Sequence, residues 1–242
     1  MNVIFTKDYE QASRAAARII AAQVNSKPDS VLGLATGSSP IGTYKELIRL
    51  NAEGDVDFSR IRTVNLDEYV GIGMECEQSY VRFMNENLFD HINIDKAGCN
   101  IPNGHAADIE KECERYDSVI RSLGGVDVQL LGIGHDGHIG FNEPSDHFSY
   151  GTNCVELEEM TIEANKRFFD SYDAVPKKAI TMGIYDIMAA KKVVLIACGK
   201  DKAAIIAKSV KGPITPMVPA SILQYHPDCT VIVDEAAAEY LK

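Results

Sequence analysis

Titratable side chains concentrate in the segment LGIGHDGHIGFNEP, residues 131–144, which follows an apolar run. Asp136, His138 and Glu143 stand close together in this segment. An imidazole with carboxylates on both sides can be oriented by one of them and exchange protons with the other. A lone histidine in a loop is more often structural, but three such side chains on one loop favour an acid–base cluster. We therefore expect Asp136, His138 and Glu143 to take part in proton transfer.

The same segment contains a literal GxGxxG pattern, formed by Gly132, Gly134 and Gly137. In a dinucleotide-binding fold this pattern opens a helix, and an acidic residue that binds ribose follows about 20 residues later. Here the chain reaches Pro144 within a few residues, which indicates an irregular loop. The pattern therefore disfavours a nucleotide cradle.

A metal site is a further interpretation of this loop, with His135, Asp136 and His138 as ligands. An HxxH pair on a glycine-rich loop lacks the fixed i, i+4 spacing of a zinc-protease helix. No further ligand stands at a recognisable spacing from the two histidines in the sequence. We expect no metal, and we expect His135 to be a surface residue.

Two further segments carry candidate residues where strand-like runs end. ATGSSP, residues 35–40, places Thr36, Gly37 and Ser38 in a turn at a helix start, where exposed N–H groups suit a phosphate. A capping turn without a ligand would explain the same residues. NLDEYVG places Asp67 and Glu68 where the chain leaves a strand, and a carboxylate there could be a general base, although paired acids at such positions are often only caps or loop residues.

Cations are also available for an anionic ligand. NKRFFD contains Arg167, and ACGKDKAAI places Lys200 and Lys202 between a strand and a helix. Either lysine could reach a phosphate bound at the helix start, whereas a solvent-exposed position is the default for each one taken singly.

These loops need a scaffold that brings strand ends together. Short β-branched or apolar runs predict strands at residues 2–5, 31–35, 61–66, 126–133, 193–198 and 230–234. Helical periodicity between them predicts helices at residues 9–24, 41–51, 79–91, 108–123 and 200–210. The alternation predicts a single α/β domain over residues 1–242, with an open, mostly parallel, Rossmann-like sheet and helices on both faces.

The composition excludes several classes of protein. A chain of 242 residues with 45% hydrophobic residues can bury a large core. A formal charge of −11 without clusters of Lys and Arg argues against a nucleic-acid partner or an anionic membrane surface. Six scattered cysteines without a CxxC pair suggest neither a zinc cage nor a disulfide framework. Without a signal peptide or an apolar stretch of membrane length, we expect a cytoplasmic protein with free thiols.

Six motifs occur in this order: LGLATGSSP, TVNLDEYVG, LLGIGHDGHIGFNEP, NKRFFD, VPKKAITMGI and CGKDKA. The ordered set resembles the glucosamine-6-phosphate deaminase family, also called glucosamine-6-phosphate isomerase. The similarity extends from about Val31 to the segment PASILQYHPDCTVIVDE. It implies conversion of glucosamine 6-phosphate, a small-molecule sugar phosphate, to fructose 6-phosphate and ammonia in amino-sugar catabolism, without an organic cofactor.

The resemblance also implies roles for individual residues. Asp67 would remove the C2 proton of the substrate and return it at C1. His138 would open the pyranose ring, with Asp136 and Glu143 setting its orientation and charge. The phosphate would be held by Thr36, Gly37, Ser38, Arg167 and Lys202.

Allosteric members of this family carry basic residues after the FNEP motif and a longer C-terminal tail. This chain has SDHFSYGTNCVELEE after FNEP and stops at Lys242. We expect a short form that is not activated by N-acetylglucosamine 6-phosphate, and either a monomer or a homo-oligomer.

Other functions fit part of the same pattern. A 6-phosphogluconolactonase or a galactosamine-6-phosphate isomerase would share the fold, but NLDEYVG and GHIGFNEP favour the deaminase. A sugar-phosphate-binding sensor domain would be a different class, and it would need an attached helix-turn-helix and a basic face, which this sequence lacks.

Overall fold

The computed structural model describes residues 1–166, 169, 171–172 and 174–241. Its main sheet has seven strands in the order β1-β10-β9-β6-β2-β3-β5, and the neighbouring strands are parallel. The strands are β1(Asn2–Thr6), β2(Val31–Leu34), β3(Arg62–Asn65), β5(Cys99–Asn100), β6(Val128–Leu131), β9(Lys192–Ala197) and β10(Cys229–Asp234). The central strands are buried along almost their whole length, as their continuous apolar runs predict.

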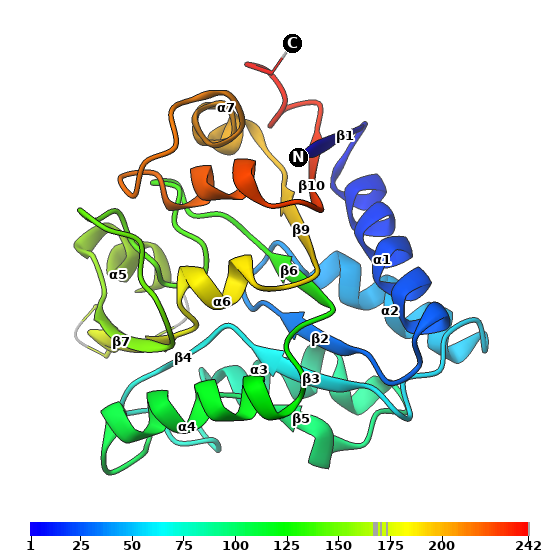
Figure 1. Cartoon of the computed structure of the whole chain (residues 1–242), viewed down its shortest axis with the longest axis vertical. Coiled ribbons are helices and arrows are strands. Elements are labelled where there is room, and N and C mark those ends of the chain that lie inside the picture. The colour runs from blue at the N-terminus through cyan, green and yellow to red at the C-terminus, as the bar shows by residue number, and fades with distance from the viewer. Residues whose placement is uncertain (167–168, 170, 173, 242) are drawn as a thin grey trace.

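Helices cover both faces of this sheet (Figure 1). Leu130 of β6 points into one apolar core and Leu131 into the other, because successive residues of a strand face opposite sides. The first core contains α1(Tyr9–Ser26), α2(Ile41–Ala52) and α3(Tyr80–Asn87). The second contains α4(Ile109–Ser122), α6(Ile184–Met188) and α7(Ala203–Lys211). The predicted α/β class, with a mostly parallel sheet between two helical layers, is confirmed.

Three helix starts follow local chemistry, whereas one predicted helix breaks near its end and another begins as a 3-10 turn. Side-chain oxygens of Asp8, Ser79 and Asp108 accept backbone N–H bonds and cap α1, α3 and α4. The helix expected over residues 79–91 breaks into α3 and the 3-10 turn η1(Phe89–His91), and the one over 200–210 begins as η4(Lys200–Lys202). The elements that were not predicted include α5(Glu159–Asn165), α6, the short strand β5 and the 3-10 turns η2(Lys96–Gly98) and η5(Pro219–Tyr225). Across the described residues, every helix is too short or too polar to span a bilayer.

A second, antiparallel sheet was not predicted either. It has three strands in the order β4-β8-β7, namely β4(Asp67–Tyr69), β7(Asn153–Glu156) and β8(Lys178–Thr181). Its apolar core also includes Phe141 and Ile162, the latter from α5(Glu159–Asn165). Its strands are short and mix charged or polar residues with apolar ones, so no continuous apolar run marks them in the sequence. The small sheet matters for the site because Asp67 is its first residue.

The parallel strands bring their carboxyl ends to one edge of the main sheet, where ligands of such folds bind. Segments that follow β2, β3, β6 and β9 meet there. After β3 the chain leaves the main sheet at Leu66, whose N–H still donates to Leu34 O at 3.1 Å. The next residue is Asp67, so the predicted base stands at the junction of the two sheets.

Candidate active site

A cavity of about 440 Å³ lies at this edge of the sheet. Most of the residues expected to act on a substrate line it, although they come from four separate segments of the chain. They are Thr36, Gly37, Ser38, Asp67, Asp136, His138 and Lys202. Glu143 is not a lining residue, but its carboxylate contacts Nδ1 of His138. Arg167, the remaining expected phosphate ligand, lies outside the described residues.

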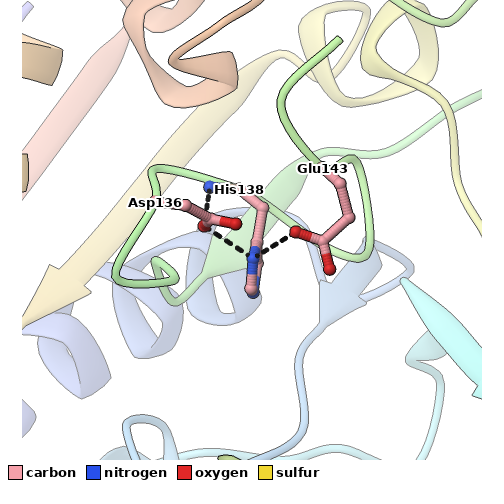
Figure 2. A group of neighbouring side chains, drawn as sticks. All are labelled: Asp136, His138 and Glu143. Carbon is pink, nitrogen blue, oxygen red and sulfur yellow. Dashed lines mark hydrogen bonds and ion pairs between the residues drawn. The ribbon is translucent and has the colours of Figure 1, made fainter. Parts of the chain in front are cut away.

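His138 is held between two carboxylates (Figure 2). Its Nδ1 lies 2.8 Å from Asp136 Oδ1 and 3.1 Å from Glu143 Oε2, and its backbone N–H donates to Asp136 Oδ1 at 3.0 Å. The ring packs flat on Gly134, where an added Cβ would come within 2.3 Å of it. Both carboxylates use the same ring nitrogen, so Nε2 is the atom left to exchange a proton with a bound molecule.

The two carboxylates control the charge of the imidazole. Burial alone would lower the pKa of His138, but the hydrogen bonds and charges of Asp136 and Glu143 outweigh burial and raise the pKa to about 9. Although burial opposes it, the contact with His138 holds the pKa of Asp136 well below its usual range. At neutral pH the ring is therefore an imidazolium that can donate a proton and take one back.

Asp67 is placed as a base with unusually high proton affinity. It is only 6% exposed, and its Oδ1 has no hydrogen-bond partner among the described residues. Burial first, and then the charge of Glu68, raise the pKa of Asp67 to about 8, while the charge of His138 opposes them. A carboxylate whose pKa lies near the working pH is an effective general base for a weak carbon acid.

The sequence indicated Glu68 only as an alternative to Asp67 as the base, and it did not indicate the aromatic wall of the cavity. The Glu68 carboxylate is buried and accepts backbone N–H bonds from Tyr69, Tyr80 and Val81, so it caps α3 and fixes this helix to β4. Burial raises the pKa of Glu68 to about 7, although these three bonds oppose the shift. Tyr80 and Phe141 line the cavity with their rings stacked at 6.3 Å between centroids. These contacts join segments that are remote in sequence, and no local signal marks them.

The expected phosphate-binding turn stands immediately before α2, as predicted. Gly37 has φ +86°, a left-handed conformation that favours glycine. The Tyr9 hydroxyl accepts the N–H of Gly42 at 2.8 Å and lies within hydrogen-bond distance of Ser38 O and Ser39 O. Tyr9 therefore ties the turn to the first turn of α2. The helix start can favour an anion placed against the turn.

The two lysines after β9 have different environments. Lys202 lines the cavity, and its Nζ donates to Ile133 O at 3.0 Å. The side chain of Lys200 is 77% exposed and lies 3.5 Å from Glu239. Lys202 is therefore the lysine that can reach an anion bound in the cavity.

A metal ion could in principle use the same acid–base cluster. Ligand atoms of Asp136, His138 and Glu143 all lie within 4.8 Å of one another. His135, considered as a ligand from the sequence, is instead exposed and paired with Asp201 at 2.8 Å. A metal on Nδ1 would have to displace a proton that the pKa of about 9 keeps on His138 at neutral pH. The donor set therefore favours proton transfer over metal binding.

The fold and the site define a class of protein. It is an α/β protein that has an acid–base cluster and a turn suited to phosphate at the carboxyl edge of its sheet. The chain belongs to the family of glucosamine-6-phosphate isomerases and 6-phosphogluconolactonases, which residues 7–232 match. A glucosamine-6-phosphate deaminase of Lachnoclostridium phytofermentans is 61% identical over 96% of this chain and 98% of that protein. One from Clostridium perfringens strain SM101 is 54% identical over the full length of both proteins.

Solved structures agree with the family assignment. A monomeric glucosamine-6-phosphate deaminase superposes with a TM-score of 0.97 at 48% identity, over 99% of this chain and 100% of that one. The 6-phosphogluconolactonase of Thermotoga maritima superposes with a TM-score of 0.75 at 21% identity, over 97% of this chain and 99% of that one. The second likeness shows the shared fold alone.

Proposed function

We propose that this protein is an enzyme, a glucosamine-6-phosphate deaminase, which converts glucosamine 6-phosphate to fructose 6-phosphate and ammonia. The observation that carries the proposal is full-length identity of 54% to a deaminase, combined with a cavity that contains a base, an imidazolium and a turn suited to phosphate. A 6-phosphogluconolactonase activity has weaker support, because the lactonase structure from Thermotoga maritima is only 21% identical.

Binding begins at the phosphate. The turn at Thr36, Gly37 and Ser38 and the ammonium group of Lys202 hold the anion, and Arg167 is proposed as a further cation. Anchoring the phosphate converts binding energy into orientation of C1 and C2, the atoms that react.

Ring opening follows at His138. The imidazolium delivers a proton to the ring oxygen as the bond between C1 and that oxygen breaks, and the neutral ring then takes the proton of the anomeric hydroxyl. Asp136 and Glu143 keep the imidazole oriented and stabilise its charged form. The products are the open-chain aldehyde and an imidazolium that has returned to its starting state.

Asp67 then moves hydrogen from C2 to C1. Its carboxylate removes the C2 proton while the aldehyde oxygen gains a proton, which gives an enolamine. Return of the proton to C1 gives a ketimine at C2, and addition of water to C2 with loss of ammonia gives fructose 6-phosphate. The stacked rings of Tyr80 and Phe141 form an aromatic wall of the cavity in which this intermediate forms.

The direct test is an assay of purified protein with glucosamine 6-phosphate, galactosamine 6-phosphate and 6-phosphogluconolactone. We expect equimolar ammonia and fructose 6-phosphate from the first compound and the highest kcat/KM on it. Rapid lactone hydrolysis without ammonia release from either amino sugar would reject the proposal.

We further propose a cytoplasmic monomer. The monomeric deaminase at 48% identity supports the oligomeric state, and the six free cysteines suit a reducing compartment. Light scattering at assay concentration is expected to give the mass of one chain, and a larger mass would contradict the monomer.

A further inference from the structure

Thr161 contacts the acid–base cluster from a different part of the molecule. Its Oγ1 donates to Glu143 Oε1 at 2.5 Å, while Oε2 of the same carboxylate contacts His138 Nδ1 at 3.1 Å. Thr161 is 6% exposed, lines the cavity and lies on α5, whereas Glu143 and His138 lie on the loop after β6. One carboxylate therefore joins α5 to the imidazole.

The two carboxylates that contact His138 are fixed in different ways. Asp136 has a short side chain, and the backbone N–H of His138 anchors its Oδ1. Glu143 has one more rotatable bond, and the hydroxyl of Thr161 holds its outer oxygen. A hydrogen bond to a carboxylate is among the stronger hydrogen bonds in proteins, and it restricts rotation of the acceptor.

We propose that Thr161 is a positioning residue for ring opening, which fixes Glu143 and through it the orientation of the His138 ring. This inference rests on the function proposed above. It makes the ring-opening step depend on the placement of α5. Asp67 lies on β4, outside the hydrogen-bond chain from Thr161 through Glu143 to His138, so the base of the enolisation step depends on that chain only through the charge of His138.

The charged groups around the imidazole define what a change at residue 161 can do. Asp136 and Glu143 face the ring from its own loop, Asp67 acts on it from β4, and Lys202 lines the same cavity from η4. Helix α5 contributes the uncharged hydroxyl of Thr161. Loss of this hydroxyl leaves every formal charge in place and changes only how firmly Glu143 is held.

The test compares Thr161→Val, which keeps the shape of the side chain but removes the donor, with Thr161→Ser, which keeps the donor. Thr230→Val is a matched control, because Thr230 is 7% exposed and lies in β10, away from the cavity. For each protein the pH profile of kcat/KM on glucosamine 6-phosphate is recorded, together with an NMR titration of the His138 ring nitrogens.

We expect Thr161→Val to lower kcat/KM about tenfold near pH 8.5 and to lower the pKa of His138 by about one unit, because Glu143 no longer stays on Nδ1. Thr161→Ser is expected to restore both values to within about twofold of the parent protein, and Thr230→Val to leave both unchanged. Equal behaviour of the Val and parent proteins, or equal defects in the Val and Ser variants, would overturn the inference. If the parent protein releases no ammonia, the proposed function fails, and the NMR titration still decides the role of Thr161.

Discussion

The pKa values of the two central groups predict a narrow pH optimum for the free enzyme. Catalysis requires an ionised Asp67, with a pKa of about 8, and a protonated His138, with a pKa of about 9. Since kcat/KM reports the free enzyme, its pH profile is expected to be bell-shaped with a maximum near pH 8.5. The fraction of enzyme that has both an ionised Asp67 and a protonated His138 falls about sixfold from pH 8.5 to pH 7, and about sixtyfold from pH 8.5 to pH 6.

Glu68 gives a way to move one side of this profile. Burial is the main cause of the raised pKa of Asp67, and the adjacent Glu68 carboxylate is the next. Glu68→Gln removes that charge, and we expect it to lower the pKa of Asp67 by about one unit. The midpoint of the acid limb of the kcat/KM profile should then move from about pH 8 to about pH 7. The fall in kcat/KM from the maximum to pH 7 should shrink to about twofold.

The assay measures ammonia release at low substrate concentration between pH 6 and pH 10. The titrations of the substrate's own amino and phosphate groups are recorded separately by NMR and divided out. Thermal melts show whether Glu68→Gln stays folded without its full set of helix-capping bonds. This explanation of the Asp67 pKa would be refuted if the acid limb of the kcat/KM profile had its midpoint near pH 4 in the parent protein. It would also be refuted if that midpoint did not move in a folded Glu68→Gln variant.

Four further outcomes are expected. Asp67→Asn should lower exchange of the C2 hydrogen with solvent at least about thousandfold while it retains phosphate-dependent binding; normal exchange would remove its role as the base. His138→Gln should lose about a hundredfold on the closed-ring substrate and much less on an open-chain one, so equal losses would contradict ring opening by this residue. Burial would raise the pKa of Asp127, but its contacts with Lys191 and Lys27 outweigh burial and lower it, so its stabilising effect is complete above its ordinary pKa and is lost as the pH falls through the lowered pKa. Asp127→Asn should therefore cost about 1–2 kcal/mol of unfolding free energy at pH 7, after allowance for the exposed lysines, and progressively less in acid, as measured by urea unfolding. Rate curves should be hyperbolic with or without N-acetylglucosamine 6-phosphate, and sigmoidal kinetics relieved by this ligand would contradict the short-form prediction.

The sequence predicted those parts of the fold that depend on local patterns. Strands such as β9 and β10 are continuous apolar runs, and their burial on both faces follows from composition. The strands β4, β7 and β8 were missed because their sequences DEY, NCVE and KAIT contain charged or polar residues and no continuous apolar run. Their pairing joins Asp67 to Thr181, which no local pattern reports.

The same distinction applies to the site. Asp136, His138 and Glu143 are close in sequence, so their contact could be anticipated from one loop. Glu68 is adjacent to Asp67 in the sequence, but its action on the pKa of Asp67 depends on the burial of both carboxylates, and the contact of Thr161 with Glu143 depends on packing between separate segments. Such contacts set the pKa values and side-chain orientations, and a single sequence contains no local signal for them.

The central claim is that one sugar phosphate contacts both the turn before α2 and the acid–base residues. A crystal structure with a reduced, open-chain analogue of glucosamine 6-phosphate tests it most directly. We expect the phosphate against Thr36, Gly37, Ser38 and Lys202, with the C2 end of the same molecule within hydrogen-bond distance of Asp67. An analogue bound with its phosphate elsewhere, or with C2 remote from Asp67, would contradict the account.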